Sequence, residues 1–234
     1  MIGGIVVIKE CLFAIFYFEK EDESIIDEVC EYFDNHCKDV MDFFGIKEVS
    51  FKTAINIIPT KEKFDVLFEK EFGFAANKSS RGMCKKDGSI NYLSINDYKN
   101  TTHAFDDEDY DKALEGFKKT LVHEFVHFIN KVFNKENKCG FSATYLTEGI
   151  AVYLSKQKEN QVFDFDFTVD DLLTHDTNKR KYYAYYLIVK YLIENYDKSL
   201  FFDMLRDKVY AEKFLKEKLY SEAKKYYKKC EERR

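Results

Sequence analysis

Short apolar runs in the first quarter of the chain predict β-strands. Residues 5–8 and 12–18 are apolar and rich in β-branched and aromatic side chains, a composition that favours strands. Residues 49–58 alternate well enough between apolar and polar positions for a further strand. Pro59 would end that strand, because proline has no N–H to donate to a neighbouring strand.

Apolar positions spaced three and four residues apart predict helices around these strands. Ser24 could cap a helix whose apolar positions continue to Phe44. Gly45 would end that helix, since glycine readily adopts the left-handed conformation found there. A shorter helix is expected over residues 60–72, closed by Gly73.

A β-hairpin is expected next, because the Asp87-Gly88 pair separates the β-prone runs 82–86 and 89–96. The acidic residues 106–109 then precede a long helical pattern that reaches Val132. Acidic side chains at the start of a helix interact favourably with its dipole. The remaining helices are expected over residues 145–158, 170–174, 179–195, 198–208 and 211–232.

This order of elements indicates an α+β fold, because strands and helices are mixed first and helices then follow alone. We expect a single domain of residues 1–234, with an upper lobe of about residues 1–133 and a lower, helical lobe of about residues 134–234.

Composition and charge argue against several classes of protein. The 37 Lys and Arg against 42 Asp and Glu give a net charge of −5, which disfavours a general nucleic-acid-binding protein. No uncharged apolar stretch approaches the roughly 18 residues of a membrane span. Lys9 and Glu10 interrupt the apolar N-terminal segment, unlike a secretory signal peptide. The six cysteines are scattered, so we expect reduced thiols, no metal held by cysteine pairs and a cytoplasmic location.

Residues 123–127 read His-Glu-Phe-Val-His within the long predicted helix. Histidines four residues apart on a helix lie about 40° apart around its axis, so both imidazoles can reach one metal ion. Two imidazole nitrogens on zinc leave room for a third ligand and a water, on which Glu124 could act as a base. The alternative is that His123 and His127 are polar residues satisfied on a half-buried helix face.

Glu148 is the best candidate for the third ligand. A carboxylate from a second, antiparallel helix would complete a two-histidine, one-glutamate site with an open fourth position, as in catalytic zinc sites. The small residues Gly149 and Ala151 would let the two helices approach closely. The alternative is an exposed helix acid. No His-x-x-Gly-x-x-His extension follows His127, which excludes the three-histidine type of site. Glu136 lies too close along the chain.

These motifs resemble those of the gluzincin metallopeptidases, the thermolysin-like and aminopeptidase-like zincins, and most closely the small peptidase MA-like members or minigluzincins. His123, Glu124 and His127 match the His-Glu-x-x-His helix, and residues 148–151 match the Glu-Gly-x-Ala segment. The resemblance implies a zincin-like fold: a small mixed sheet and helices in the upper lobe, a helical lower lobe, and one Zn²⁺ ion in the cleft between them.

The resemblance also implies a tyrosine that donates a hydrogen bond to the tetrahedral intermediate. The family's spacing from a helical leucine assigns this role to Tyr182, with Tyr183 as the nearest alternative and His175 as another candidate. Aromatic packing would explain any one of these tyrosines equally well. Nothing matches the Gly-x-Met-Glu-Asn segment of aminopeptidases, so an endopeptidase is expected. Residues 89–96 could form the edge strand along which an extended peptide pairs.

The prediction is therefore a zinc-dependent peptidase that hydrolyses a peptide or protein substrate, with Glu124 as the general base. The alternative is a catalytically inactive or non-peptidase protein of the zincin fold that acts as a binding module. The presence of Glu124 favours the enzyme, because a purely structural metal site does not need an acid at that position.

Overall fold

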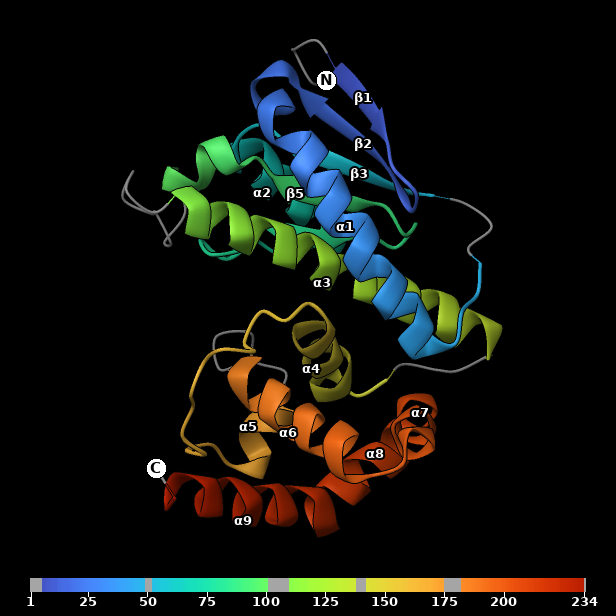
Figure 1. The fold of residues 1–234 in the computed structure, drawn as a ribbon, viewed down its shortest axis with the longest axis vertical. Coiled ribbons are helices and arrows are strands. Elements are labelled where there is room, and N and C mark those ends of the chain that lie inside the picture. The colour runs from blue at the N-terminus through green and yellow to red at the C-terminus, as the bar shows by residue number, and fades with distance from the viewer. Residues whose placement is uncertain (1–5, 49–51, 101–109, 138–141, 175–181, 234) are drawn as a thin grey trace. The chain divides into compact units, whose positions relative to one another are not determined.

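The chain divides into two compact units, Met1–Lys131 and Val132–Arg234. The first contains a β-sheet with helices, and the described part of the second is helical, so the fold belongs to the α+β class. The boundary between the units lies within one long helix. This computed structural model describes residues 6–48, 52–100, 110–137, 142–174 and 182–233 (Figure 1).

A mixed five-stranded sheet forms the framework of the first unit. Its strands are β1 (Val6–Glu10), β2 (Ala14–Glu19), β3 (Thr53–Ile58), β4 (Gly82–Cys84) and β5 (Ile90–Leu93). The order across the sheet is β1-β2-β3-β5-β4. The strands β2, β3 and β5 are parallel, whereas β1 and β4 pair antiparallel with their neighbours and form the two edges.

The predicted hairpin at Asp87-Gly88 is confirmed, with Gly88 in the left-handed region at a φ of +88°. The prediction of an edge strand over residues 89–96 is wrong. The strand β5 is shorter and lies inside the sheet, paired with both β3 and β4, and the 3₁₀ helix η2 (Ile95–Asn100) follows it. The edge on this side of the sheet is therefore β4.

The helices of the first unit are α1 (Glu23–Phe44), α2 (Lys61–Phe72) and α3 (Tyr110–Glu136). Gly45 and Gly73 end α1 and α2 in the left-handed conformation, as predicted. The Thr60 hydroxyl caps α2 by accepting a hydrogen bond from the Lys63 N–H. Ser24 does not cap α1, because the 3₁₀ turn η1 (Lys20–Asp22) runs directly into this helix, which begins one residue earlier.

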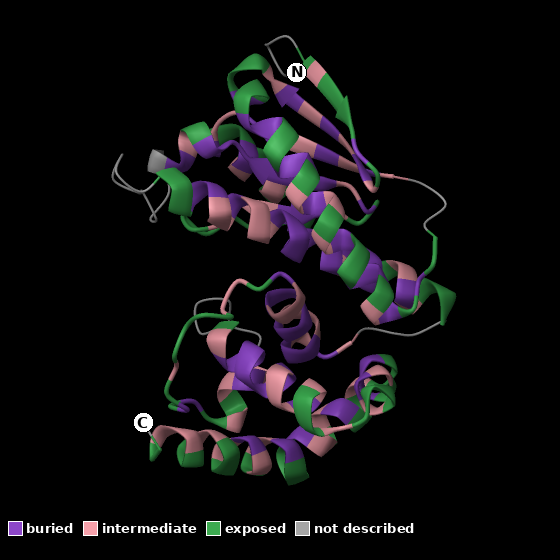
Figure 2. Ribbon diagram, viewed as in Figure 1, coloured by how far each residue is buried: buried purple, intermediate pink, exposed green. Residues whose placement is uncertain are grey.

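The helices α1 and α3 lie on one face of the sheet (Figure 1), and aromatic packing joins them to it. Phe33 of α1 meets Phe16 of β2 edge-to-face at 5.7 Å between ring centroids and Phe125 of α3 at 5.3 Å. Phe117 of α3 meets Tyr92 of β5 in the same way at 4.7 Å. All five residues are buried. Figure 2 shows buried and exposed positions alternating along α1, as expected for a helix with one face on the core.

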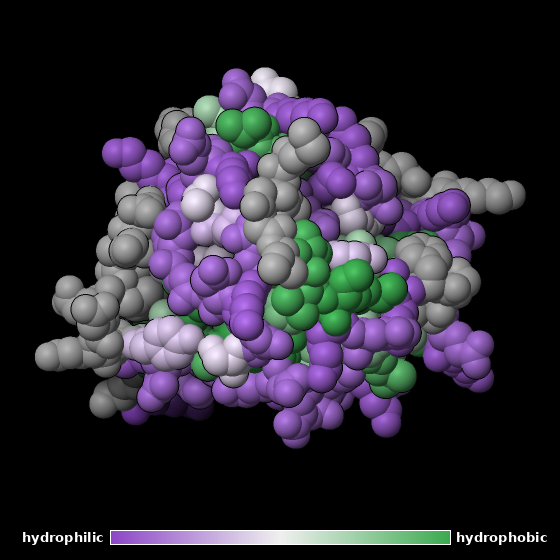
Figure 3. Space-filling view, turned by 90° about the horizontal axis from the view of Figure 1, so that it is seen from above, coloured by the Kyte–Doolittle hydropathy of each residue, from purple (hydrophilic) through white to green (hydrophobic). Residues whose placement is uncertain are grey.

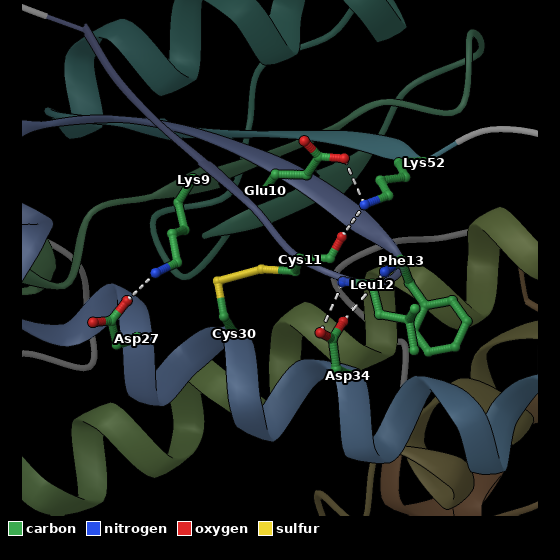
Figure 4. The surroundings of a disulfide bond; sticks show 9 residues. All are labelled: Lys9, Glu10, Cys11, Leu12, Phe13, Asp27, Cys30, Asp34 and Lys52. Atoms are coloured by element: carbon green, nitrogen blue, oxygen red, sulfur yellow. Dashed lines mark hydrogen bonds and ion pairs between the residues drawn. A yellow bond between two sulfur atoms is a disulfide. The ribbon is translucent and has the colours of Figure 1, made fainter.

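A disulfide between Cys11 and Cys30 ties the β1–β2 turn to α1, which contradicts the prediction of reduced thiols (Figure 4). The two Cα atoms lie 6.0 Å apart. The Asp34 carboxylate of α1 accepts hydrogen bonds from the N–H groups of Leu12 at 2.8 Å and Phe13 at 3.2 Å in the same turn. These contacts hold the tip of the hairpin against the helix. The free thiols of the described residues are Cys37, Cys84 and Cys230.

The second unit contains α4 (Thr144–Leu154), α5 (Val169–Leu173), α6 (Tyr182–Asn195), α7 (Lys198–Arg206), α8 (Lys208–Phe214) and α9 (Tyr220–Glu231). The π-helical turn η5 (Leu215–Leu219) joins α8 to α9, so the predicted helix over 211–232 begins earlier and contains a π turn. The predicted helix over 145–158 ends earlier, because Lys156 adopts a left-handed conformation at a φ of 57°.

Gly149 lets α4 pack closely against α6. A Cβ atom at this position would lie 2.5 Å from Cγ2 of Val189 and 2.6 Å from the backbone oxygen of Tyr185. The small residue was expected to bring α4 close to the histidine-bearing helix, and the structure shows instead that it faces α6. A methyl group of Val189 and the backbone of Tyr185, both in α6, occupy the space that a side chain at this position would need.

None of the described helices has both the length and the apolar character needed to cross a membrane. The surface seen in Figure 3 is mainly hydrophilic, with a few apolar patches. The most exposed large apolar side chains of the first unit include Ile8, Leu12, Val66 and Phe74.

Removing the disulfide should destabilise the chain. We expect Cys30→Ser to lower the free energy of unfolding by about 3 kcal/mol without reductant, because the closed loop restricts the unfolded chain. Urea unfolding monitored by circular dichroism measures this difference. With reductant the parent protein should unfold at the urea concentration of the variant. Cys230→Ser, at a free and partly exposed thiol, is the matched control and should change little.

Two glycine-to-alanine substitutions should act in opposite directions. Gly149→Ala should destabilise by about 1–3 kcal/mol, because the added methyl group would meet backbone as well as a side chain. Gly116→Ala in α3 has open space around the new methyl group and should stabilise by about 0.5–1 kcal/mol. Thermal unfolding compares the two variants. Equal stability of Gly149→Ala and the parent protein would contradict the packing described for α4 and α6.

Candidate metal centre

The helix α3 carries His123, Glu124 and His127 and has two distinct sides. Phe125 lies on the buried side, where it contacts Phe33 of α1 and Phe13 of the β1–β2 turn. Because successive residues turn by about 100°, His123 and His127 point to the opposite side of the helix from Phe125. The aromatic contacts therefore determine the direction in which both imidazoles project.

The two imidazoles are already spaced for a common ion. His123 is 7% exposed and His127 is half-buried. Their Nε2 atoms lie 3.1 Å apart, with the rings at 81° to each other. Two nitrogens bound to a tetrahedral zinc at about 2.0–2.1 Å would be roughly 3.3 Å apart. The observed spacing fits that geometry closely.

Glu148 of α4 completes the group. One nitrogen of each histidine and one carboxylate oxygen of Glu148 all lie within 4.8 Å of one another. The three side chains could therefore hold a metal ion. Two imidazoles and a carboxylate are the donors of many catalytic zinc sites, and zinc prefers nitrogen donors more than calcium or magnesium does.

Glu124 is 8% exposed and lies against the edge strand β4. A Cβ atom on Gly82 would come within 2.9 Å of both Glu124 Oε1 and the ring of Tyr92. Only a residue without a side chain lets the strand pass this close to the carboxylate. Burial is the main cause of the raised pKa of Tyr92, and the negative charge of Glu124 raises it further.

Lys131 fixes the end of the same edge strand to α3. Its Nζ donates hydrogen bonds to the backbone oxygens of Cys84 at 3.1 Å and Lys85 at 2.6 Å. The same Nζ lies 3.2 Å from Cys84 Sγ. Burial raises the pKa of the Cys84 thiol to about 11, although Lys131 opposes the shift. The thiol is therefore protonated at neutral pH and is a poor nucleophile and metal ligand.

The structure distinguishes the two tyrosines expected to assist catalysis. Tyr183 donates its hydroxyl hydrogen to Asp166, and burial together with this contact raises its pKa. Its ring also stacks on Phe163. Tyr182 is the first residue of α6 and is 41% exposed, with its ring edge-to-face on Tyr185. Its role remains a prediction, and His175 lies outside the described residues.

Sequence reasoning did not identify Gly82 and Lys131 as neighbours of the site. Both act through backbone: Gly82 by close approach to Glu124, and Lys131 by binding carbonyl oxygens. The only signal in the sequence is the position of Lys131 one turn beyond His127. Nothing in the sequence indicates that β4 lies beside α3.

Loss of one imidazole should abolish metal binding. We expect protein with His127→Ala, purified without chelator, to contain less than about a tenth of an equivalent of zinc by elemental analysis, because too few ligands remain. His36→Ala is the matched control, since His36 hydrogen-bonds the backbone of its own helix α1 and should leave metal content unchanged. A full equivalent of zinc in the His127 variant would remove this residue from the site.

Comparison with protein families and curated proteins identifies no relative of this chain. No protein-family model matches the chain, and no curated protein matches it significantly. The functional interpretation therefore depends on the His-Glu-x-x-His helix and on the geometry of the His–His–Glu group.

Proposed function

We propose that this chain is a zinc-dependent peptidase of the gluzincin type with a zincin-like fold. In this proposal His123, His127 and Glu148 hold one Zn²⁺ ion and Glu124 is the general base. The supporting observation is a three-donor group with a nearly buried carboxylate next to it in the chain. In the described part of the chain no fourth His, Cys, Asp or Glu joins the group. Three protein ligands and an open position are typical of catalytic zinc.

The residues of the chain divide the chemistry between them. A bound zinc ion would act as a Lewis acid towards the attacking water and the scissile carbonyl. Glu124 would accept the proton of that water and deliver it to the leaving amine nitrogen. Its burial against Gly82 suits this role, because a carboxylate in a confined place is held in one orientation.

The edge strand β4 supports a peptide as the substrate. Its outer side has no neighbouring strand in the described sheet, and it lies next to Glu124. An extended polypeptide could add to such an edge through main-chain hydrogen bonds, which tolerate many side chains. Recognition of backbone rather than of a chain terminus favours an endopeptidase.

Tyr182 is the tyrosine that the spacing of the resembled family assigns to the remaining role, and it is 41% exposed. The Tyr183 hydroxyl donates a hydrogen bond to Asp166. We propose that Tyr182 donates a hydrogen bond to the oxygen that becomes negatively charged during attack. Donors of this kind contribute about 3–4 kcal/mol to transition-state stabilisation.

The proposed location is the cytoplasm, as expected from the sequence. The Cys11–Cys30 disulfide counts against this location, because such bonds are rare in reducing compartments. The proposal therefore requires these two thiols to be largely reduced inside the cell, and alkylation of freshly lysed cells followed by mass spectrometry measures their state.

The substitution Glu124→Gln tests the proposal most directly. We expect zinc content to remain at one equivalent and cleavage of fluorescein-labelled casein to fall by about 10²–10⁴-fold, because the variant has no proton acceptor. A chelator should abolish cleavage by the parent protein, and added zinc should restore it. Glu115→Gln is the matched control, since Glu115 lies on the same helix and pairs with Lys119 at the surface.

Cleavage by Glu124→Gln at the parent rate would remove Glu124 from the reaction. Zinc-loaded parent protein that leaves casein and a mixed peptide library intact would instead favour the alternative of a non-hydrolytic binding module.

A further inference from the structure

A third polar residue follows the two histidines along the same side of α3. Asn130 lies three residues beyond His127, so the three side chains fall within an arc of about 60° around the helix. Asn130 is about 4.5 Å farther along the helix axis than His127. All three are on the side opposite Phe125, which packs into the core of the first unit.

Asn130 is buried without a hydrogen bond to its carboxamide oxygen. The residue is 5% exposed, and its Oδ1 has no hydrogen-bond partner among the described residues. An acceptor removed from water in this way lowers stability, and so it needs an explanation in each structure. Asn91 is a buried asparagine whose carboxamide oxygen is paired: it is 4% exposed, and its Oδ1 accepts a hydrogen bond from Asn56 Nδ2 at 2.9 Å.

The residues around Asn130 make an apolar side chain the simpler choice at this position. Its neighbours Ile129 and Phe133 are buried. Leucine has the same branched shape and the same number of non-hydrogen side-chain atoms as asparagine. An unpaired amide oxygen that persists beside a proposed reactive group is expected where function offsets a loss of stability.

We propose that Asn130 is a substrate-positioning residue whose carboxamide pairs with a backbone peptide group of the bound polypeptide. This inference rests on the proposed peptidase function and deepens it. A carboxamide offers one acceptor and an N–H donor side by side, which matches the C=O and N–H of a peptide group.

The neutral character of Asn130 also indicates which part of the substrate it contacts. A terminal carboxylate would call for a cation and a terminal amine for an acid. The nearest cation along α3, Lys131, is bound to the backbone oxygens of β4. Asn130 therefore suits an internal peptide group, which supports cleavage within a chain rather than at its end.

The experiment compares casein binding with and without the carboxamide. Both proteins carry Glu124→Gln so that casein stays intact, and binding of fluorescein-labelled casein is measured by fluorescence anisotropy. We expect Asn130→Leu to raise the Kd at least tenfold, to leave zinc at one equivalent, and to leave the melting temperature unchanged or higher. In the active protein the same substitution should raise KM more than it lowers kcat.

A matched control separates this role from a structural one. Asn91→Leu removes a buried asparagine that has a partner, so it should lower the melting temperature and leave the Kd for casein unchanged. A fall in melting temperature for Asn130→Leu similar to that of Asn91→Leu would show a structural carboxamide, paired with the fold or a buried water, and would overturn the inference.

Unchanged casein affinity in Asn130→Leu would also overturn it, as would the absence of any casein binding by the Glu124→Gln protein. Failure of the proposed function is a separate result. If zinc-loaded parent protein does not cleave casein, the proposed peptidase activity is wrong. A loss of casein binding in Asn130→Leu would still identify Asn130 as a contact with the polypeptide.

Discussion

The packing of Phe125 against Phe33 determines how α3 is rotated about its own axis, and the candidate metal centre depends on that rotation. Phe33 also contacts Phe16 of β2, so three aromatic rings connect α3, α1 and the sheet. A turn of α3 by a few tens of degrees would separate these rings. It would also move His123, His127 and Asn130 away from their common direction, because all three are fixed to the same rod. Core packing and site geometry are therefore one constraint.

The edge strand β4 depends on the same helix in a second way. Gly82 approaches Glu124, and Lys131 holds the carbonyl oxygens at the end of the strand. The strand has only three residues and a single neighbour in the sheet. Its position is thus set as much by α3 as by hydrogen bonds to β5. The contacts of Gly82 and Lys131 therefore fix the distance between Glu124 on α3 and the edge strand β4.

Local signals in the sequence predicted much of the fold. The glycines that end α1 and α2, the Asp87-Gly88 turn and the histidine spacing on α3 each depend on a few neighbouring residues. Features that need distant segments were not accessible. The pairing of Cys11 with Cys30, the burial of β5 inside the sheet and the contact of Gly149 with α6 arise only after folding. Glu148 is an intermediate case. The sequence motif identified it as a candidate ligand, but its distance from the two histidines could be known only from the structure.

The π-helical turn η5 has a consequence for the end of the chain. Ala211, Leu215, Leu219 and Ala223 are all fully buried and follow one another at intervals of four residues. In a regular α-helix each interval of four residues turns the side-chain direction by about 40° around the helix axis. The four side chains would therefore point progressively away from the helices beneath them. A wider turn takes up one additional residue and reverses part of that drift. The last two helical segments can therefore lie straight along their support, where an uninterrupted α-helix would have to coil around it.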